Sequence, residues 1–352
     1  MRRRRITPIT VVVAAAATTV TGIARADPAG SNGVSLYGII DAYVGSVKTS
    51  GGSPSAYLVG NGGMTTSFWG MRGSEDLGGG YRTLFALESY FQPQNGQAGR
   101  SAVDAFFSHS AFVGVAAPFG TLTAGQQISP FFRSQTQFSP FGGSTTLNPL
   151  LLHSYRAPYG RALAGDDLIS NALVYASPSV GGFSTMLAYA FGNVPGAPGE
   201  NNVIGTVYYE NGPFASTIGV QRLRIRDYPS SPPSDLGDAS NQLDIHVGLS
   251  YDLSLVKGFL EYQRSNNGSI SRKDNIVQVG GTVRMNPSNW LLASWARNTI
   301  TGSPTRHTRD TASIAYDYLL SKRSDVYVAY QYDKADGQGS ANSLIAGLRH
   351  KF

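Results

Sequence analysis

The chain has 352 residues, of which 41% are hydrophobic and only 14% are charged, and it contains no cysteine. Soluble domains carry about 25% charged residues, and the mean hydropathy of −0.14 is too low for a protein built from several membrane-spanning helices. The missing cysteines exclude disulfides, thiolate metal sites and cysteine nucleophiles. This composition fits a transmembrane β-barrel, in which only every second strand residue faces lipid.

Residues 1–26 have the features of a secretory signal peptide, with a basic run from Arg2 to Arg5, a short apolar core and an Ala-Arg-Ala ending before Asp27. The apolar core is too short for the alternative, a transmembrane anchor. Removal of these residues leaves 23 basic and 22 acidic residues. The mature chain, 27–352, is therefore almost neutral, and the basic precursor gives no support to a nucleic-acid partner.

Short segments of alternating polarity recur from residue 35 to the end, separated by Gly, Pro, Asn and Asp, and they predict strands. Short and long connections alternate between these strands, as in outer-membrane barrels with short periplasmic turns and long external loops. We predict sixteen strands, starting near Ser35, Ser67, Tyr81, Ala105, Thr121, Leu168, Phe183, Asn202, Ala215, Gln242, Lys257, Asn275, Trp290, Thr311, Asp325 and Ser343.

The last strand alternates in polarity up to Phe352, the final residue. A strand that ends the chain leaves an open sheet edge unless it pairs with the first strand, which closes a barrel. Eight strands enclose only side chains, whereas sixteen enclose water. The predicted fold is therefore all-β, a transmembrane 16-stranded antiparallel β-barrel wide enough for a channel.

Several short motifs occur in the order found in one known family. They are 35–42 (SLYGIIDA), 70–78 (GMRGSEDLG), 112–114 (FVG), 119–123 (FGTLT), 175–178 (YASP), 320–323 (LSKR) and 347–352 (GLRHKF). With these motifs the chain resembles the trimeric general porins of Gram-negative outer membranes. The resemblance implies a homotrimer in the outer membrane and a third external loop that folds inward to narrow the pore. It also implies that Phe352 helps the barrel-assembly machinery to recognise the chain.

The segment 128–167 fits that constriction loop, because long loops without regular structure are usually functional. It is rich in proline and aromatic residues, which suits a stiff segment packed against the barrel wall. It contains no acidic residue from 128 to 165, but it contains Arg133, Arg156 and Arg161. Basic character therefore lies on the loop itself.

Alternation along the strands identifies candidate pore-lining residues. With the apolar residues of each strand facing lipid, the opposite face carries Asp41, Arg72, Arg82, Glu88, Arg222 and Arg224. Phe68, His109 and Gln126 stand where the resemblance implies arginines. The facing of His109 and Gln126 stays open, because β-bulges near loops shift the parity.

We expect a water-filled channel for passive diffusion of small hydrophilic solutes and ions, with a weak anion preference from the basic loop and wall. The expected partners are two further copies of the chain, outer-membrane lipid and lipopolysaccharide, and the assembly machinery. No metal or other cofactor is expected. One alternative is a substrate-specific channel. The other is a barrel enzyme, although none of the five histidines lies in a catalytic motif.

Overall fold

The computed structural model describes residues 33–52, 55, 57–102, 104–155, 165–192, 201–224, 241–268, 271–302 and 307–352. The predicted signal peptide and two of the predicted pore residues, Arg156 and Arg161, lie outside this part of the chain. Within the described residues, no helix is long and apolar enough to cross a membrane.

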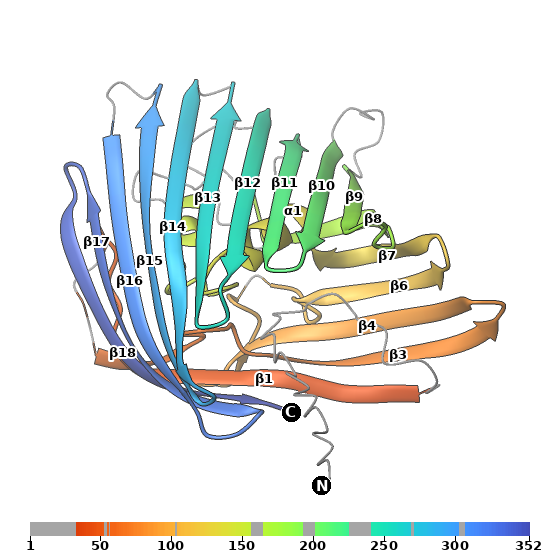
Figure 1. Cartoon of the computed structure of the whole chain (residues 1–352), viewed down its shortest axis with the longest axis horizontal. Coiled ribbons are helices and arrows are strands. Elements are labelled where there is room, and N and C mark those ends of the chain that lie inside the picture. The colour runs from red at the N-terminus through yellow and green to blue at the C-terminus, as the bar shows by residue number, and fades with distance from the viewer. Residues whose placement is uncertain are drawn as a thin grey trace, which may run out of the picture.

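The chain forms a closed antiparallel barrel of sixteen strands (Figure 1). The strands are β1 (Gly33–Ser46), β2 (Tyr57–Asn61), β3 (Phe68–Gly78), β4 (Tyr81–Gln92), β5 (Gln97–Ala98), β6 (Ser110–Ala117), β7 (Gly120–Ile128), β8 (Leu168–Ala176), β9 (Phe183–Phe191), β10 (Asn201–Asn211), β11 (Phe214–Leu223), β12 (Gln242–Asp252), β13 (Val256–Asn267), β14 (Arg272–Asn286), β15 (Asn289–Thr301), β16 (His307–Leu319), β17 (Ser324–Ala335) and β18 (Gly339–Lys351). The short β2 and β3 both pair with β1 and share one position in the ring, and β5 pairs only with the end of β4.

The ring closes between the first and last strands, as the terminal strand predicts. β1 pairs with β18 from Ile39–Lys351 to Ser46–Leu344. Phe352 extends the pairing, because its N–H donates to the carbonyl of Gly38 at 3.1 Å and its own carbonyl accepts from Gly38 N at 3.3 Å. No edge of the main sheet is left open at this seam, which removes a template for aggregation.

The two faces of the barrel strands differ in chemistry. One face carries exposed apolar side chains, for example Leu36, Val113, Ile218, Val328 and Leu344. The other face of β11–β17 is largely polar and buried. Exposed apolar residues on a continuous outer surface belong in hydrocarbon, so the sorting fits a membrane barrel.

The connections follow the predicted alternation only in part. At one end every connection is short, from 79–80 to 320–323. At the other end the connections up to β12 are long, but those after β13, β15 and β17 span only 268–271, 302–306 and 336–338. The strands β13–β18 are 12–15 residues long, whereas β6–β9 have 8 or 9. Residues that form loops elsewhere therefore extend the strand ladder here.

Glycines make room for two large aromatic side chains near the seam. A Cβ added at Gly347 would lie 2.2 Å from Cζ of Tyr327, and one at Gly60 would lie 2.1 Å from Cζ of Tyr43. Only glycine fits below these rings. The rings cover strand positions that would otherwise have no side chain.

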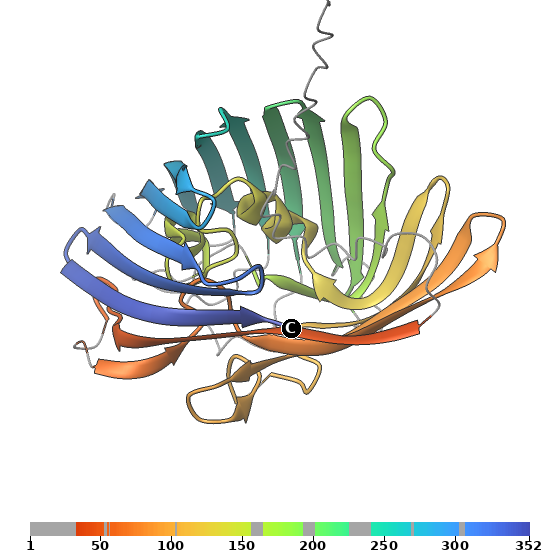
Figure 2. The same cartoon turned by 60° about the horizontal axis from the view of Figure 1, so that its bottom comes forward.

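The segment between β7 and β8 contains two short helices, α1 (Pro130–Gln137) and α2 (Pro149–Tyr155). Ser129 caps α1 by accepting from Phe131 N at 3.2 Å, and Asn148 Oδ1 accepts from Leu150 N at 3.1 Å at the start of α2. Each helix has a proline in its first turn, where the missing N–H has no intrahelical partner to lose. Figure 2 shows both helices between β10–β12 and β1.

Candidate pore wall and constriction

The loop segment 129–155 is fastened along the polar face of β11–β16. Ser134 Oγ lies 3.1 Å from His246 Nδ1, and Gln135 Nε2 donates to Gln263 Oε1 at 2.5 Å. Further along the segment, Leu150 N donates to Oε1 of Gln278 on β14 at 2.7 Å. Apolar side chains such as Phe131, Phe138 and Leu150 are fully buried beneath it, so the segment has a core of its own with the wall.

The same segment continues to β17 and to the join of β2 and β3. Gln331 Nε2 donates to the Thr146 carbonyl at 3.0 Å, and Ser144 Oγ donates to the Gly63 carbonyl at 2.7 Å. Arg309 donates to the Leu152 carbonyl at 3.2 Å. We call the face of β11–β17 that this segment contacts the covered wall.

The covered wall holds many acidic side chains, yet all of them are buried and partnered. Hydrogen bonds and ion pairs offset part of the cost of burying these carboxyl groups. The acids with their partners are Asp244 with Gln221 (2.7 Å), Glu261 with Gln278 (2.5 Å), Asp274 with Arg272 (2.8 Å), Asp317 with Arg349 (3.7 Å), Asp325 with Arg349 (3.1 Å) and Asp333 with Arg309 (2.8 Å). Solvent reaches almost none of this negative charge.

One hydrogen-bonded chain in the covered wall has the order of a hydrolase triad. Ser134 Oγ contacts His246 Nδ1 at 3.1 Å, and His246 Nε2 contacts Glu261 Oε1 at 3.1 Å. All three residues are fully buried. Ser134 Oγ also donates to the Phe131 carbonyl at 2.7 Å, inside its own helix. A nucleophile must reach a substrate carbonyl, so this chain of contacts anchors α1 and offers no reactive centre.

The helices α1 and α2 pack against β9–β12 and β14–β16, and we call the same face of β1, β3, β4 and β6 the open wall. The Arg72 guanidinium lies 4.6 Å from the ring centre of Tyr37, and Arg82 donates to Ser74 Oγ at 2.8 Å. Phe68 stacks on His109 with ring centres 4.6 Å apart. These arginines and Phe68 are half-buried, so part of each side chain borders solvent.

Glu88 is the acid of the open wall, and it is enclosed by partners. The Tyr37 hydroxyl donates to one carboxylate oxygen and His109 Nδ1 contacts the other. His109 therefore faces the same side as Glu88, which answers the question left by the sequence. Gln126 points the other way, since its amide bonds to the Phe107 carbonyl and to Ser170 Oγ.

Arg133 on α1 is the loop cation within the described residues that faces the open wall. Burial lowers the pKa of its guanidinium, although the neighbouring Tyr208 hydroxyl and Glu88 carboxylate oppose this shift. Its Nε is buried and has no hydrogen-bond partner among the described atoms. Arginine stays protonated in proteins, so α1 presents a positive charge toward Glu88.

Asp41 and two further arginines lie elsewhere than predicted. Asp41 is 0% exposed, because Met64 N, Thr65 N and the Tyr327 hydroxyl donate to its carboxylate at 2.9, 2.7 and 2.5 Å. It lies on the predicted face but does not border solvent. Arg222 and Arg224 are on the opposite face from the one predicted. They share the face of Ile218, which is 56% exposed, whereas the intervening Gln221 is buried on the covered wall.

An ionic cluster that sequence reasoning missed joins two connections at the long-loop end. Arg100 pairs with Asp104 at 3.1 Å, with Asp166 at 2.7 Å and with Asp167. Although burial opposes the effect, Asp167 and Asp166 raise the pKa of Arg100. The Tyr90 hydroxyl donates to Asp167 at 3.0 Å. The cluster ties residues 93–109 to the end of the segment 128–167, and only the adjacent acids at 166–167 hinted at it.

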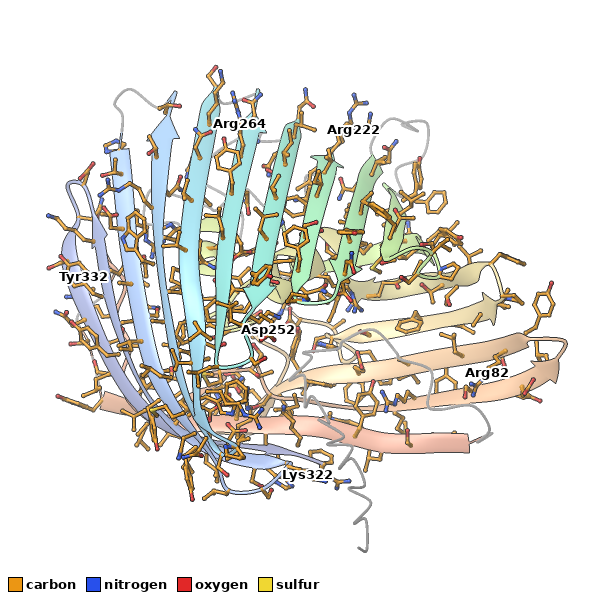
Figure 3. All side chains as sticks on the ribbon, in the orientation of Figure 1. Arg82, Arg222, Asp252, Arg264, Lys322 and Tyr332 are labelled. Carbon is orange, nitrogen blue, oxygen red and sulfur yellow. The ribbon has the colours of Figure 1, made fainter. Side chains whose placement is uncertain are left out.

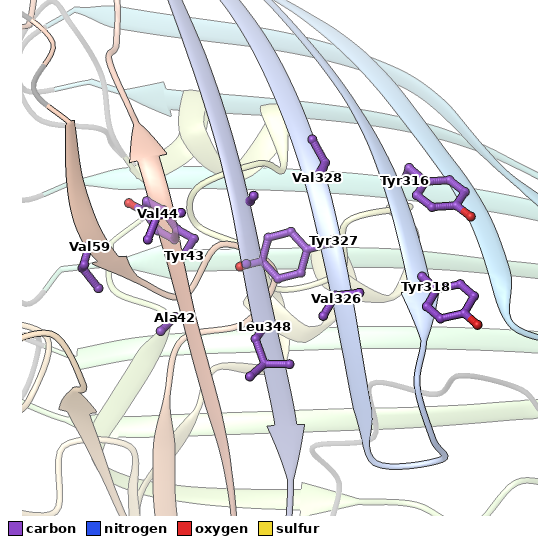
Figure 4. A pocket seen from close by; sticks show the side chains of 12 residues that line it. Ala42, Tyr43, Val44, Val59, Tyr316, Tyr318, Val326, Tyr327, Val328 and Leu348 are labelled. Carbon is purple, nitrogen blue, oxygen red and sulfur yellow. The ribbon is translucent and has the colours of Figure 1, made fainter.

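A shallow apolar hollow lies away from both walls, on the exposed apolar face across the barrel seam (Figure 4). Its lining includes Val44, Val59, Tyr316, Val328 and Leu348. The hollow offers no charged group and belongs to the surface that contacts lipid or protein.

A closed barrel of this width with a polar interior face and an apolar outer face defines the class of outer-membrane channel proteins. A family model for Gram-negative porins matches residues 11–338, and the chain belongs to that family. It is an outer-membrane porin.

Individual relatives agree with this assignment. Outer membrane porin protein 32 of Delftia acidovorans is 27% identical over 313 residues, covering 84% of this chain and 82% of the relative. An outer membrane porin protein of Bordetella pertussis is 26% identical over 397 residues, covering 96% of this chain and 98% of the relative. Among solved structures, an anion-selective porin from Comamonas acidovorans has a TM-score of 0.73 at 22% identity, covering 92% of this chain and 100% of that one.

Proposed function

We propose that this porin is a water-filled channel through which small hydrophilic solutes and ions diffuse passively, with a weak preference for anions. The segment 128–167 is the inward-folded constriction loop, and the pore runs between Arg133 and the open wall. Arg72, Arg82, Glu88 and Arg133 line it. Arg156 and Arg161 of the same loop are proposed to add to its positive charge.

The observation that carries the anion preference is the unequal exposure of charges. The acids of the covered wall are buried and paired with neighbouring side chains. The arginines of the open wall and Arg133 are only half-buried, while Glu88 is enclosed by Tyr37 and His109. An ion in the pore responds mainly to charges that border the water. The solved porin from Comamonas acidovorans, which is described as anion-selective, supports the same sign.

The test is the zero-current potential of single channels in a planar bilayer across a tenfold KCl gradient. In an anion-preferring channel, the zero-current potential has the sign that diffusion of chloride down its gradient produces. A potential of the opposite sign would contradict the proposal. Conductance steps in groups of three would support a homotrimer, which is also consistent with a solved trimeric relative of the same fold.

A substrate-specific channel is the second candidate, because the open wall is unusually aromatic. Phe68 stacks on His109, and Tyr37 and Tyr90 lie edge-on to this pair at 6.1 and 4.6 Å. Liposome swelling with neutral sugars of rising size separates the two candidates. Swelling rates that fall smoothly with sugar size support general diffusion. A single sugar that enters much faster than its size predicts supports a specific site.

The remaining partners are proposals as well. Phe352 is half-exposed and ends a strand that pairs along β1, which is consistent with recognition of this strand by the barrel-assembly machinery. Deletion of Phe352 is expected to lower the amount of folded protein in the outer membrane without changing the conductance of channels that do assemble.

A further inference from the structure

Four aromatic side chains of the open wall form one continuous series of ring contacts. Tyr37 lies edge-on to Phe68 with ring centres 6.1 Å apart, and Phe68 stacks on His109 at 4.6 Å with only 5° between the ring planes. Tyr90 lies edge-on to His109 at 4.6 Å. The four rings come from β1, β3, β4 and the residue before β6. We call Tyr37, Phe68, His109 and Tyr90 the aromatic track.

One part of the track borders solvent and the other part supports it. His109 and Tyr90 are 8% and 6% exposed, whereas Tyr37 and Phe68 are half-buried. A solute in the pore would therefore meet the rings of Tyr37 and Phe68, which the two buried rings hold in place. Rings fixed in this way lose little freedom when a further ring packs against them.

A cation lies at the end of the track that is nearer the short connections. The Arg72 guanidinium is 4.6 Å from the ring centre of Tyr37, a cation–π distance. Arg72 is four positions from Phe68 on the same face of β3, about 13 Å along the strand. Gly70 stands between them on that face, so no side chain of β3 separates the ring from the cation.

The other charges near the track have partners of opposite charge or are enclosed. Arg82, close to the turn between β3 and β4 (Figure 3), is directly opposite Asp76 in the ladder. At the other end, Arg100 lies 5.4 Å from the ring centre of Tyr90, but the three aspartates of the ionic cluster hold it. Glu88 is enclosed by two members of the track. The charge that accompanies the solvent-facing rings is therefore that of Arg72.

We propose that the aromatic track and Arg72 together make this pore selective for planar aromatic carboxylates, with benzoate as the simplest example. The solute ring packs against Tyr37 and Phe68 while its carboxylate pairs with Arg72, whose planar fork suits a carboxylate. This inference rests on the proposed function, because it needs a wet pore that anions enter.

The chemistry of the track favours this class of solute over two others. A saturated ring with the same carboxylate gains the attraction of the guanidinium but not the ring–ring contact. An aromatic cation gains the ring contact but meets a positive charge. Phe68 and His109 stand where the family resemblance implies arginines, so this wall has exchanged cations for rings and kept Arg72 beside them.

The test compares benzoate with cyclohexanecarboxylate, which has the same charge and the same number of ring carbons but no aromatic ring. Zero-current potentials of single channels, with KCl on one side and the potassium carboxylate on the other, give the permeability of each. F68L and F68M keep an apolar side chain without a ring. Each is expected to lower the ratio of benzoate to cyclohexanecarboxylate permeability roughly two- to tenfold, which is what an aromatic pair contributes beyond its buried area.

Three further variants serve as controls. F68Y keeps a ring at this position and is expected to keep the ratio. F112L removes a ring from the same face two strands away, where Phe112 pairs with Ala86, and is also expected to keep it. R72Q is expected to lower the permeability of both carboxylates relative to potassium at least about twofold, because it removes one charge beside the solute.

An unchanged ratio in F68L and F68M would overturn the proposal, since the ring of Phe68 would then contribute nothing to selection. An equal fall in F112L would overturn it as well, because any ring in the pore would suffice. The zero-current potential of the same channels in a KCl gradient tests the proposed function separately. Chloride preference there, together with an unchanged ratio in F68L, would therefore contradict the track alone and leave the anion-preferring channel standing.

Discussion

The two walls of this barrel carry charge in opposite ways. The covered wall is rich in acids, but a loop segment lies over it and each acid has a buried partner, as Asp333 has in Arg309. The open wall has fewer charges, and its arginines, Arg72 and Arg82, remain half-exposed. The comparison teaches that a count of interior acids and bases does not predict the charge that a permeating ion meets. Burial decides which of these charges act on the pore and which act on stability.

The largest expected effect comes from breaking an ion pair of the covered wall. Arg309 and Asp333 are both 1% exposed at the side chain and are joined by two hydrogen bonds of 2.8 and 3.0 Å. R309A leaves a buried carboxylate without its partner, which costs about 3–5 kcal/mol. We expect a large loss of heat stability, measured by circular dichroism in detergent.

The chain offers a matched control for that variant. Arg297 and Asp310 form the same two-bond pair at 2.9 and 3.1 Å on the outer face, where Arg297 is 55% exposed. R297A is expected to cost much less than R309A, because water screens an exposed pair. Equal losses in the two variants would show that burial does not distinguish the walls.

The second effect tests how tightly the loop segment lies on the covered wall. A Cβ at Gly248 would lie 2.7 Å from Cγ of Phe138, which is fully buried, whereas a Cβ at Gly258 would meet nothing within 4 Å. G248A is therefore expected to cost about 1–3 kcal/mol through overpacking, and to raise conductance if the segment moves. Like G248A, G258A makes the unfolded chain less flexible, which favours the folded state, but its new Cβ meets no neighbouring atom. G258A is therefore expected to be neutral or slightly stabilising.

Much of this architecture follows from the sequence, and the failures have physical causes. Alternation identified the sixteen strands, the closure through Phe352 and the facing of Arg72, Arg82 and Glu88. Arg222 and Arg224 were assigned to the wrong face because Leu223 was taken as lipid-facing. Near the external rim the expected sorting of residues is reversed. Basic residues lie on the outer face above the apolar band, and the apolar Leu223 is buried.

Interactions between distant segments were beyond the reach of periodicity. The helices α1 and α2 were not predicted, because the segment has many prolines and its helices are short and stabilised by the wall. The enclosure of Asp41 depends on Tyr327, which is 286 positions away. A single sequence shows which residues share a strand face, but not which loop covers that face.

A third prediction concerns how stability depends on pH, and it rests on a histidine that is buried in the folded protein and solvated in the unfolded chain. Burial, and then the charge of Arg309, lower the pKa of His153 well below its usual value. The folded protein therefore keeps His153 neutral, while the unfolded chain takes up a proton once the pH falls below about 6.5. Stability is present above that pH and is lost as the pH falls, with a slope of at most about 1.4 kcal/mol per pH unit from one group.

H153Q is expected to flatten this acid dependence of the melting temperature between pH 7.5 and pH 5. T311V removes the partner of His153 Nε2, at 2.7 Å, and keeps the titrating group. It is expected to lower stability at both pH values and to leave the slope intact. An unchanged slope in H153Q would show that the neutral buried histidine does not couple loop packing to pH.

The smallest energy decides the functional comparison. One charge at about 10 Å in water changes the energy of an ion by about 0.4 kcal/mol, a roughly twofold change in its occupancy. R133A removes a loop cation that faces the open wall. The permeability ratio of chloride to potassium is expected to fall about fourfold, because chloride loses and potassium gains a factor of about two. D244N removes a carboxyl group from the covered wall, where Asp244 is 0% exposed. Its ratio is expected to stay within error of the wild type, because buried amides already hold that carboxylate and the loop segment separates it from the water. Zero-current potentials measure both ratios. A larger shift in D244N than in R133A would mean that ions respond to the covered acids. The distinction between the two walls would then fail for conduction, while it still held for stability.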